Sequence, residues 1–148
     1  MGIKLFNSPF EMELRTVLLL SVARNTPFTV ERILALDFIT CYAADFGLSY
    51  VNLHGQNSLK YGEISNRRML VQESVKSLVV KGLASVTTDR GYLFSISEEG
   101  KKFARKFTSI YAKDYKKIAK VAVKKYKNDS DENILAMIQS HSVSAVRN

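Results

Sequence analysis

The chain has 148 residues, of which 46% are hydrophobic and 24% charged, and this length and composition are typical of one globular domain with its own core. A single cysteine excludes an internal disulfide and a thiolate zinc site, and it fits a reducing compartment. The longest apolar run, residues 17–20, is too short to cross a bilayer, and residues 1–6 lack the apolar segment of a signal peptide. We therefore expect a cytoplasmic protein with no membrane partner.

The first third of the chain predicts two helices. Residues 8–11 (Ser-Pro-Phe-Glu) supply a capping serine, a proline in the first turn and a glutamate three residues after the cap, and this helix continues to about Asn25. A second helix over residues 30–46 stops at Gly47. Because it is apolar over most of its circumference, we expect it to be the most buried helix. Residues 48–62 lack periodicity and predict a long ordered loop.

A third helix and a β-hairpin follow. Helical periodicity extends over residues 63–81 and ends at Gly82. Two short β-patterned segments, residues 83–88 and 92–97, flank the turn at residues 89–91 (Asp-Arg-Gly). The hairpin corresponds to the wing of a winged-helix domain, and the third helix then occupies the place of its recognition helix.

The C-terminal part predicts two more helices. Ser97 caps a long fourth helix that extends to Lys127, and a short helix runs from Asp131 to about His141. The expected fold is therefore mainly α with a small β-hairpin (α+β): a winged-helix-like domain over residues 1–127 that includes a long basic C-terminal helix. Residues 128–148 form a short helix and tail.

The positive charge is concentrated in that fourth helix. The chain has a formal net charge of +8, whereas residues 101–127 alone carry +10 and the remainder −2. One apolar stripe at helical spacing is expected to pack into the core or to contact a partner, and it consists of Phe103, Phe107, Ile110, Tyr111, Ile118, Ala122 and Tyr126.

A run of lysines fills the other faces of the same helix. Such a surplus of cations favours a phosphate backbone, bound without sequence information, or an acidic protein surface, while a merely solubilising face remains the alternative. The lysines that we assign to polyanion or DNA-backbone contact are Lys113, Lys116, Lys117, Lys120 and Lys124.

The sequence offers no catalytic motif. It lacks a phosphate-binding loop, an HExxH motif, a GxSxG elbow and a Gly-rich dinucleotide turn. His54 and His141 have no partner at metal-ligand spacing, and Cys41 lies among apolar residues where it is expected to be a small buried hydrophobe. We therefore expect a protein that is not an enzyme and that binds neither a metal nor another cofactor.

Two acids on the second helix stand out. Asp37 and Asp45 are eight residues apart, about 12 Å along a helix, which is too far to share one small ion. Asp45 falls in the last helical turn, where the dipole disfavours a negative charge. The obvious donors are Arg67 and Arg68 at the start of the third helix, and we expect one of them to form a structural ion pair with Asp45.

Contacts on the third helix and the wing separate two function classes. Arg68, Gln72 and Lys76, with Arg90 at the hairpin turn, would contact DNA or a partner protein. Glu73 in the middle of that helix face would repel phosphates. A free-standing winged-helix DNA-binding transcription regulator remains the alternative to an interaction subunit, because winged helices serve both purposes.

Several segments in a fixed order resemble one family, the middle component of bacterial ABC-three-component systems, which includes the small accessory subunit of Lamassu-type defence operons. The resemblance covers residues 5 to 120. The segments are Asn7-Ser8-Pro9-Phe10-Glu11 with Leu14-Arg15, Leu36-Asp37-Phe38-Ile39 with Asp45-Phe46-Gly47, Leu53-His54, Gly62-Glu63-Ile64 with Arg67-Arg68, Lys81-Gly82-Leu83, and Tyr92 with Tyr111-Ala112.

The resemblance implies a non-enzymatic adaptor. Its implied partners are an SMC-like ABC ATPase and an effector, often a nuclease, in defence against phage or plasmid DNA. One departure from the family lies in the loop, where Gly55-Gln56-Asn57 stands in place of prolines. The resemblance does not account for the surplus of lysines, so contact with double-stranded DNA is inferred from charge alone.

Overall fold

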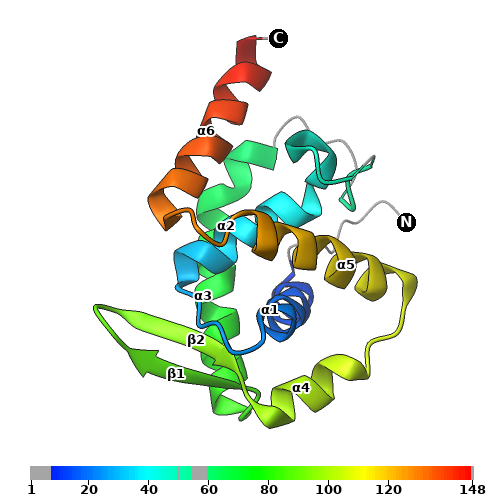
Figure 1. Cartoon of the computed structure of the whole chain (residues 1–148), viewed down its shortest axis with the longest axis vertical. Coiled ribbons are helices and arrows are strands. Elements are labelled where there is room, and N and C mark those ends of the chain that lie inside the picture. The colour runs from blue at the N-terminus through cyan, green and yellow to red at the C-terminus, as the bar shows by residue number, and fades with distance from the viewer. Residues whose placement is uncertain (1–7, 50, 55–59, 148) are drawn as a thin grey trace.

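The computed structural model describes residues 8–49, 51–54 and 60–147 (Figure 1). The expected combination of helices with one antiparallel hairpin is confirmed. The expectations that concern residues 1–6 and 55–57 lie outside the described residues. The helices are α1 (Pro9–Ala23), α2 (Val30–Cys41), α3 (Ile64–Val80), α4 (Glu98–Arg105), α5 (Ile110–Lys125) and α6 (Asp131–Arg147), with the 3-10 turns η1 (Ala43–Phe46) and η2 (Lys60–Glu63).

The core forms around α1 and α2. The Ser8 hydroxyl accepts a hydrogen bond from the Glu11 N–H over 3.1 Å, so α1 begins where its capping signal predicts. Thr29 caps α2 in the same way, over 3.0 Å from the Arg32 N–H. Every residue from 33 to 41 is buried, which confirms α2 as a central helix. Helices α1, α3, α5 and α6 all pack against it.

The second helix is shorter than predicted. It ends at Cys41, and the chain continues through Tyr42 into η1. Gly47 then adopts the left-handed conformation at φ 74°, as its position at the end of a helical segment requires. Asp45 therefore lies in a separate turn and not on the same helix as Asp37.

The hairpin forms in the predicted place, with β1 (Ala84–Thr88) antiparallel to β2 (Tyr92–Ile96). Arg90 (φ 60°) and Gly91 (φ 134°) make the turn between them. On the far side of β2, Phe28 forms an isolated bridge to Phe94, with both N–H···O distances at 2.8 Å. Figure 1 shows the hairpin projecting from the helical body.

The single long basic helix is not formed. Helix α4 ends at Arg105, and α5 begins at Ile110. The new helix begins there because the Ser109 hydroxyl accepts a hydrogen bond from the Ala112 N–H over 3.1 Å and caps it. The residues that face the core therefore differ from the predicted apolar stripe. Ile110 is 81% exposed, whereas Tyr115 is fully buried.

Helix α6 extends further than predicted, to Arg147. Ile134 and Ile138 belong to the same hydrophobic core as α2, so this helix packs on the body through its first half. Its C-terminal end points away from the body in Figure 1. Across the described ranges, no helix combines the length and the apolar character that a membrane crossing needs.

Candidate functional site

Asp37 is the centre of a buried polar cluster that joins four helices. Its carboxylate receives Arg15 Nε of α1 at 2.9 Å, Arg67 Nη1 of α3 at 2.6 Å and the Tyr115 hydroxyl of α5 at 2.7 Å. All four side chains are inaccessible to solvent or nearly so. A buried carboxylate is costly unless it is paired and hydrogen-bonded, and here both oxygens are used.

The charges in this cluster fix its ionisation. Burial alone would raise the pKa of Asp37, but Arg15 and Arg67 outweigh burial and hold that pKa well below its usual range. Burial raises the pKa of Tyr115, and the neighbouring carboxylate raises it further. Tyr115 is therefore a neutral hydrogen-bond donor to an ionised acceptor, which is the stronger class of hydrogen bond.

Arg67 is more than a counter-ion. Its guanidinium carbon lies 5.4 Å from the centre of the Phe38 ring and 5.9 Å from that of Tyr42, so aromatic faces of α2 and the turn after it cover the cation. Nη2 lies 3.9 Å from a Glu63 carboxylate oxygen. Within the described ranges, Nε and Nη2 make no hydrogen bond. Aromatic contact and nearby carboxylates stabilise this charge in place of a full set of hydrogen bonds.

The predicted pairing of Asp45 with Arg67 or Arg68 is wrong, because both arginines bind other carboxylates. Arg67 binds Asp37, and Arg68 makes a bidentate contact to Glu31 with Nε and Nη2 both at 2.9 Å. The end of α2 at Cys41 explains the change, since it moves Asp45 into η1. There Asp45 accepts a hydrogen bond from the Asn52 side chain over 3.1 Å.

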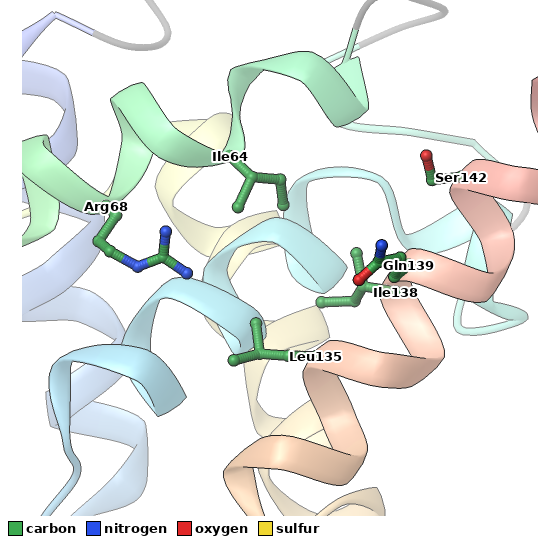
Figure 2. Close-up of a pocket in the computed structure, with 6 residues that line it drawn as sticks. All are labelled: Ile64, Arg68, Leu135, Ile138, Gln139 and Ser142. Atoms are coloured by element: carbon green, nitrogen blue, oxygen red, sulfur yellow. The ribbon is translucent and has the colours of Figure 1, made fainter.

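A small cavity lies between α3 and α6, beside the Arg68–Glu31 pair. Its volume is about 250 Å³, and Figure 2 shows Arg68 at one side of it and Gln139 of α6 at the other. Leu135 and Ile138 supply apolar walls. The guanidinium of Arg68 is already bound by Glu31, so the cavity offers no uncommitted charge for an anion.

His54 and Cys41 also lie close to the cluster. His54 Nε2 is 2.9 Å from the Tyr111 hydroxyl, and burial, assisted by the positive charge of Arg15, lowers the pKa of His54 to about 3. Burial beside Asp37 raises the pKa of the Cys41 thiol to about 12. The imidazole is neutral and the thiol protonated at neutral pH, so neither is poised as a general acid or a nucleophile.

Most of the predicted lysine face is exposed on α5. Lys113, Lys117, Lys120 and Lys124 are exposed, whereas Lys116 is partly buried with Nζ 3.5 Å from the Ala104 carbonyl oxygen. The helix break separates these lysines from the two of α4, both of which pair with glutamates one turn away. Contact with a polyanion remains a prediction for these residues.

The other predicted contact residues lie in different surroundings. Gln72 and Lys76 line an apolar groove between α3 and the hairpin, and Arg90 is exposed in the turn. Lys76 lies 3.7 Å from Glu73. Gln72 and Lys76 therefore lie on one surface, whereas Arg68 binds Glu31.

Sequence reasoning missed Arg15 and Tyr115. A signal existed for Arg15, because it occupies a core-facing position of α1 while Asp37 occupies one in an otherwise apolar helix. Opposite charges on two buried faces indicate a pair. No group of three or more histidine, cysteine, aspartate or glutamate side chains is placed to hold a metal in the part of the chain that the structure describes.

Comparison with known proteins identifies one family. The chain matches the model of the ABC-three component (ABC-3C) system Middle Component 2 over residues 5–148. Searches of curated proteins and of solved structures found no significant match. The middle component of a multi-subunit system has protein partners. The chain therefore belongs to the ABC-three component system Middle Component 2 family.

Proposed function

We propose that the chain is a non-enzymatic adaptor subunit of a Lamassu-type defence complex, in which it links an SMC-like ABC ATPase to an effector such as a nuclease. The observation that carries this proposal is the family match over residues 5–148. A middle component acts beside the other components of its system. The target of the complete complex would be phage or plasmid DNA, as the sequence resemblance implies.

A structural role is supported by the way the polar core is used. Asp37 accepts hydrogen bonds from Arg15, Arg67 and Tyr115 and is 1% exposed, so no substrate reaches it. A catalytic carboxylate needs access to the reacting atoms. The cluster instead stabilises the relative positions of α1, α2, α3 and α5, which is what a docking scaffold needs.

A second part of the proposal concerns DNA. Among the described residues, the exposed lysines of α5 form no ion pair with an acidic side chain, whereas lysines on α3 and α4 pair with glutamates. Such a face suits a phosphate backbone, which is recognised by charge and carries no sequence information. The face would hold DNA near the ATPase without selecting a site.

The regulator alternative has less support. A winged-helix reader presents its recognition helix to base edges, and α3 beside the hairpin would have to take that role here. However, Arg68 is bound by Glu31, and Gln72 and Lys76 border an apolar groove. An apolar groove on the protein is better suited to contact with another protein than to contact with DNA, whose surface is hydrated and negatively charged.

Co-purification tests the adaptor proposal. The full-length chain would carry the affinity tag and be expressed with the ABC ATPase and the third component encoded beside it. We expect the ATPase to be retained through gel filtration with the tagged chain. Recovery of the tagged chain alone, with both other proteins folded and present in the lysate, would contradict the proposal, as would ATP or DNA hydrolysis by the chain alone.

A further inference from the structure

An apolar groove runs between α3 and the β-hairpin. It has a volume of about 620 Å³, with Val75 and Phe94 buried at its base. Besides these two residues, Val79, Val80, Val86 and Tyr92 supply most of its apolar lining. Lys76 is the single charged residue in this lining, so water is held weakly along most of its length.

Large apolar side chains at the groove are left open to solvent. Val80 is 87% exposed, Tyr92 67% and Val86 41%. Val86 and Tyr92 stand on the same face of the hairpin as Phe94, because strand partners and alternate residues share a face. The inner face of the hairpin thus continues outward beyond the core. Contiguous exposed apolar surface of this kind marks a binding site.

The outer edge of β1 has unpaired backbone groups. The Ser97 N–H donates to the Leu83 carbonyl and the Asp89 N–H to the Gly91 carbonyl, at 3.2 and 2.9 Å. Hydrogen-bonded and non-hydrogen-bonded pairs alternate along an antiparallel ladder. The pairs at Ser85 and Thr87 are therefore the hydrogen-bonded ones.

The backbone groups of Val86 and Thr88 consequently point away from β2. The hydrogen bonds of Phe94, the partner of Val86, are consistent with this pattern. Its N–H and its carbonyl both bind Phe28, on the side of β2 that faces away from β1. No other described segment hydrogen-bonds to the backbone of Val86 or Thr88. Two donors and two acceptors are available at the open edge.

This edge lacks the usual protection against strand addition. Natural edge strands carry lysine, proline or a bulge that prevents pairing with another chain. Residues 84–88 (Ala-Ser-Val-Thr-Thr) contain neither a charge nor a proline, and their register with β2 is unbroken. The composition is that of a strand that pairs on both sides.

We propose that this edge and the adjoining groove bind an extended, uncharged segment of the ABC ATPase, which adds to β1 as a further strand. This inference deepens the proposed function and rests on it, since an ABC protein is the partner class that the family description itself names. Backbone groups of the segment pair with Val86 and Thr88. Its alternate side chains, on the same face as Val86, enter the groove against Val79 and Val80, in the manner of strand addition beside a helix.

Two variants and one control test this assignment in the co-expressed complex. Val80→Glu places a charge in the groove from a position so exposed that the fold does not depend on it. Val86→Pro removes the outward N–H, which the hairpin does not use. Ile110→Glu is the matched control, because Ile110 is an 81% exposed apolar residue on α5, away from the groove.

We expect each groove variant to retain roughly tenfold less ATPase than the unchanged chain, and Ile110→Glu to retain a normal amount. Circular dichroism of each purified variant checks folding, and Val80→Glu remains informative if Val86→Pro does not fold. Normal retention by a folded Val80→Glu variant would overturn the inference and leave the proposed function standing. Failure of the unchanged chain to retain the ATPase would overturn both.

Amide hydrogen exchange distinguishes strand addition from other contacts. In the free chain, we expect slow exchange at the amides of Ser85 and Thr87 and fast exchange at those of Val86 and Thr88. In the complex, we expect the latter two to slow by at least roughly tenfold. Unchanged exchange there would contradict strand addition. A free chain that is dimeric by light scattering, and monomeric as Val80→Glu, would assign the edge to a second copy and overturn the ATPase assignment.

Discussion

The Tyr115 hydroxyl donates to Asp37 Oδ1 over 2.7 Å, and this contact joins α5 to α2 at the centre of the molecule. The same oxygen accepts from Arg15 Nε, while the other accepts from Arg67 Nη1. One carboxylate therefore sets the positions of three neighbouring helices. The basic face of α5 and the groove-lining face of α3 are both positioned from this point.

Removing the charge of Asp37 should strongly destabilise the fold. In Asp37→Asn, two guanidiniums stay buried without the anion that both of them bind, and breaking a buried ionic cluster in this way costs about 3–5 kcal/mol. Urea unfolding monitored by circular dichroism measures the change in the free energy of unfolding. Glu31→Gln is the control, because its partner Arg68 is partly exposed and such a pair contributes about 1 kcal/mol or less. Equal effects of the two substitutions would contradict the central role of Asp37.

His54 should make stability depend on pH under mildly acidic conditions. Its pKa is lowered from 6.5 to about 3 in the folded chain, so the unfolded chain binds the extra proton first as pH falls. The contribution of His54 to the free energy of unfolding is complete above pH 6.5. Below that pH it falls by about 1.4 kcal/mol per pH unit, until His54 is protonated in the folded chain as well.

The substitution His54→Gln tests this dependence while keeping a polar partner for Tyr111. We expect a flatter profile of unfolding free energy between pH 6.5 and 5, a range above the window in which Asp37 begins to titrate in the unfolded chain. Chemical denaturation at several pH values gives the profile. A slope that is the same with and without the imidazole would assign the pH dependence to other groups.

The break between α4 and α5 should depend on Ser109. Replacing a capping serine by alanine costs about 1 kcal/mol, and the Ser109 hydroxyl caps the Ala112 N–H. Thermal unfolding of Ser109→Ala measures the loss. Thr108→Ala changes the neighbouring exposed hydroxyl and should be nearly neutral, so a comparable loss there would show that the cap is not the cause.

The lysines of α5 should set the salt dependence of DNA binding. Each phosphate contact contributes about −0.9 to the slope of log affinity against log salt on duplex DNA, so replacing Lys113, Lys117 and Lys120 by Gln should flatten the slope by roughly two to three units. Fluorescence anisotropy with unrelated duplexes at several salt concentrations measures the slope. Binding should not differ between the sequences.

A charge-matched triple variant controls for net charge. Lys81, Lys101 and Lys102 each pair with a glutamate, so their replacement by Gln removes the same number of charges from positions that are already neutralised. We expect the slope to stay unchanged there. If both triple variants flatten the salt slope equally, the effect is one of net charge alone. Sequence-selective binding that is lost in Arg68→Gln would favour the transcription regulator.

Local chemistry made the helix starts and the hairpin predictable. The Ser8 cap and the Asp-Arg-Gly turn at residues 89–91 act within a few residues, and both formed where the sequence indicates. The break at Ser109 was missed because apolar residues continue at helical spacing across it. A capping serine inside such a pattern is recognisable only when the preceding turn is also known to end.

The polar cluster was harder to predict because its members are distant in sequence. Arg15, Arg67 and Tyr115 lie 22, 30 and 78 residues from Asp37. Charge arguments based on neighbouring helix ends therefore paired Arg67 with the wrong aspartate. The groove could not be predicted either, since the exposure of Val80 at the end of α3 and of Tyr92 on β2 depends on how helix and hairpin pack together.

The separation of Tyr115 from Asp37 has a consequence for synthesis. A chain leaving the ribosome presents Asp37 and both arginines before Tyr115 and the rest of α5 are available. Contacts between residues this far apart close long loops, so they form late in folding. We expect the N-terminal helices to remain open to chaperones and proteases until residue 115 has emerged, and a nascent chain arrested before that point to be cleaved readily.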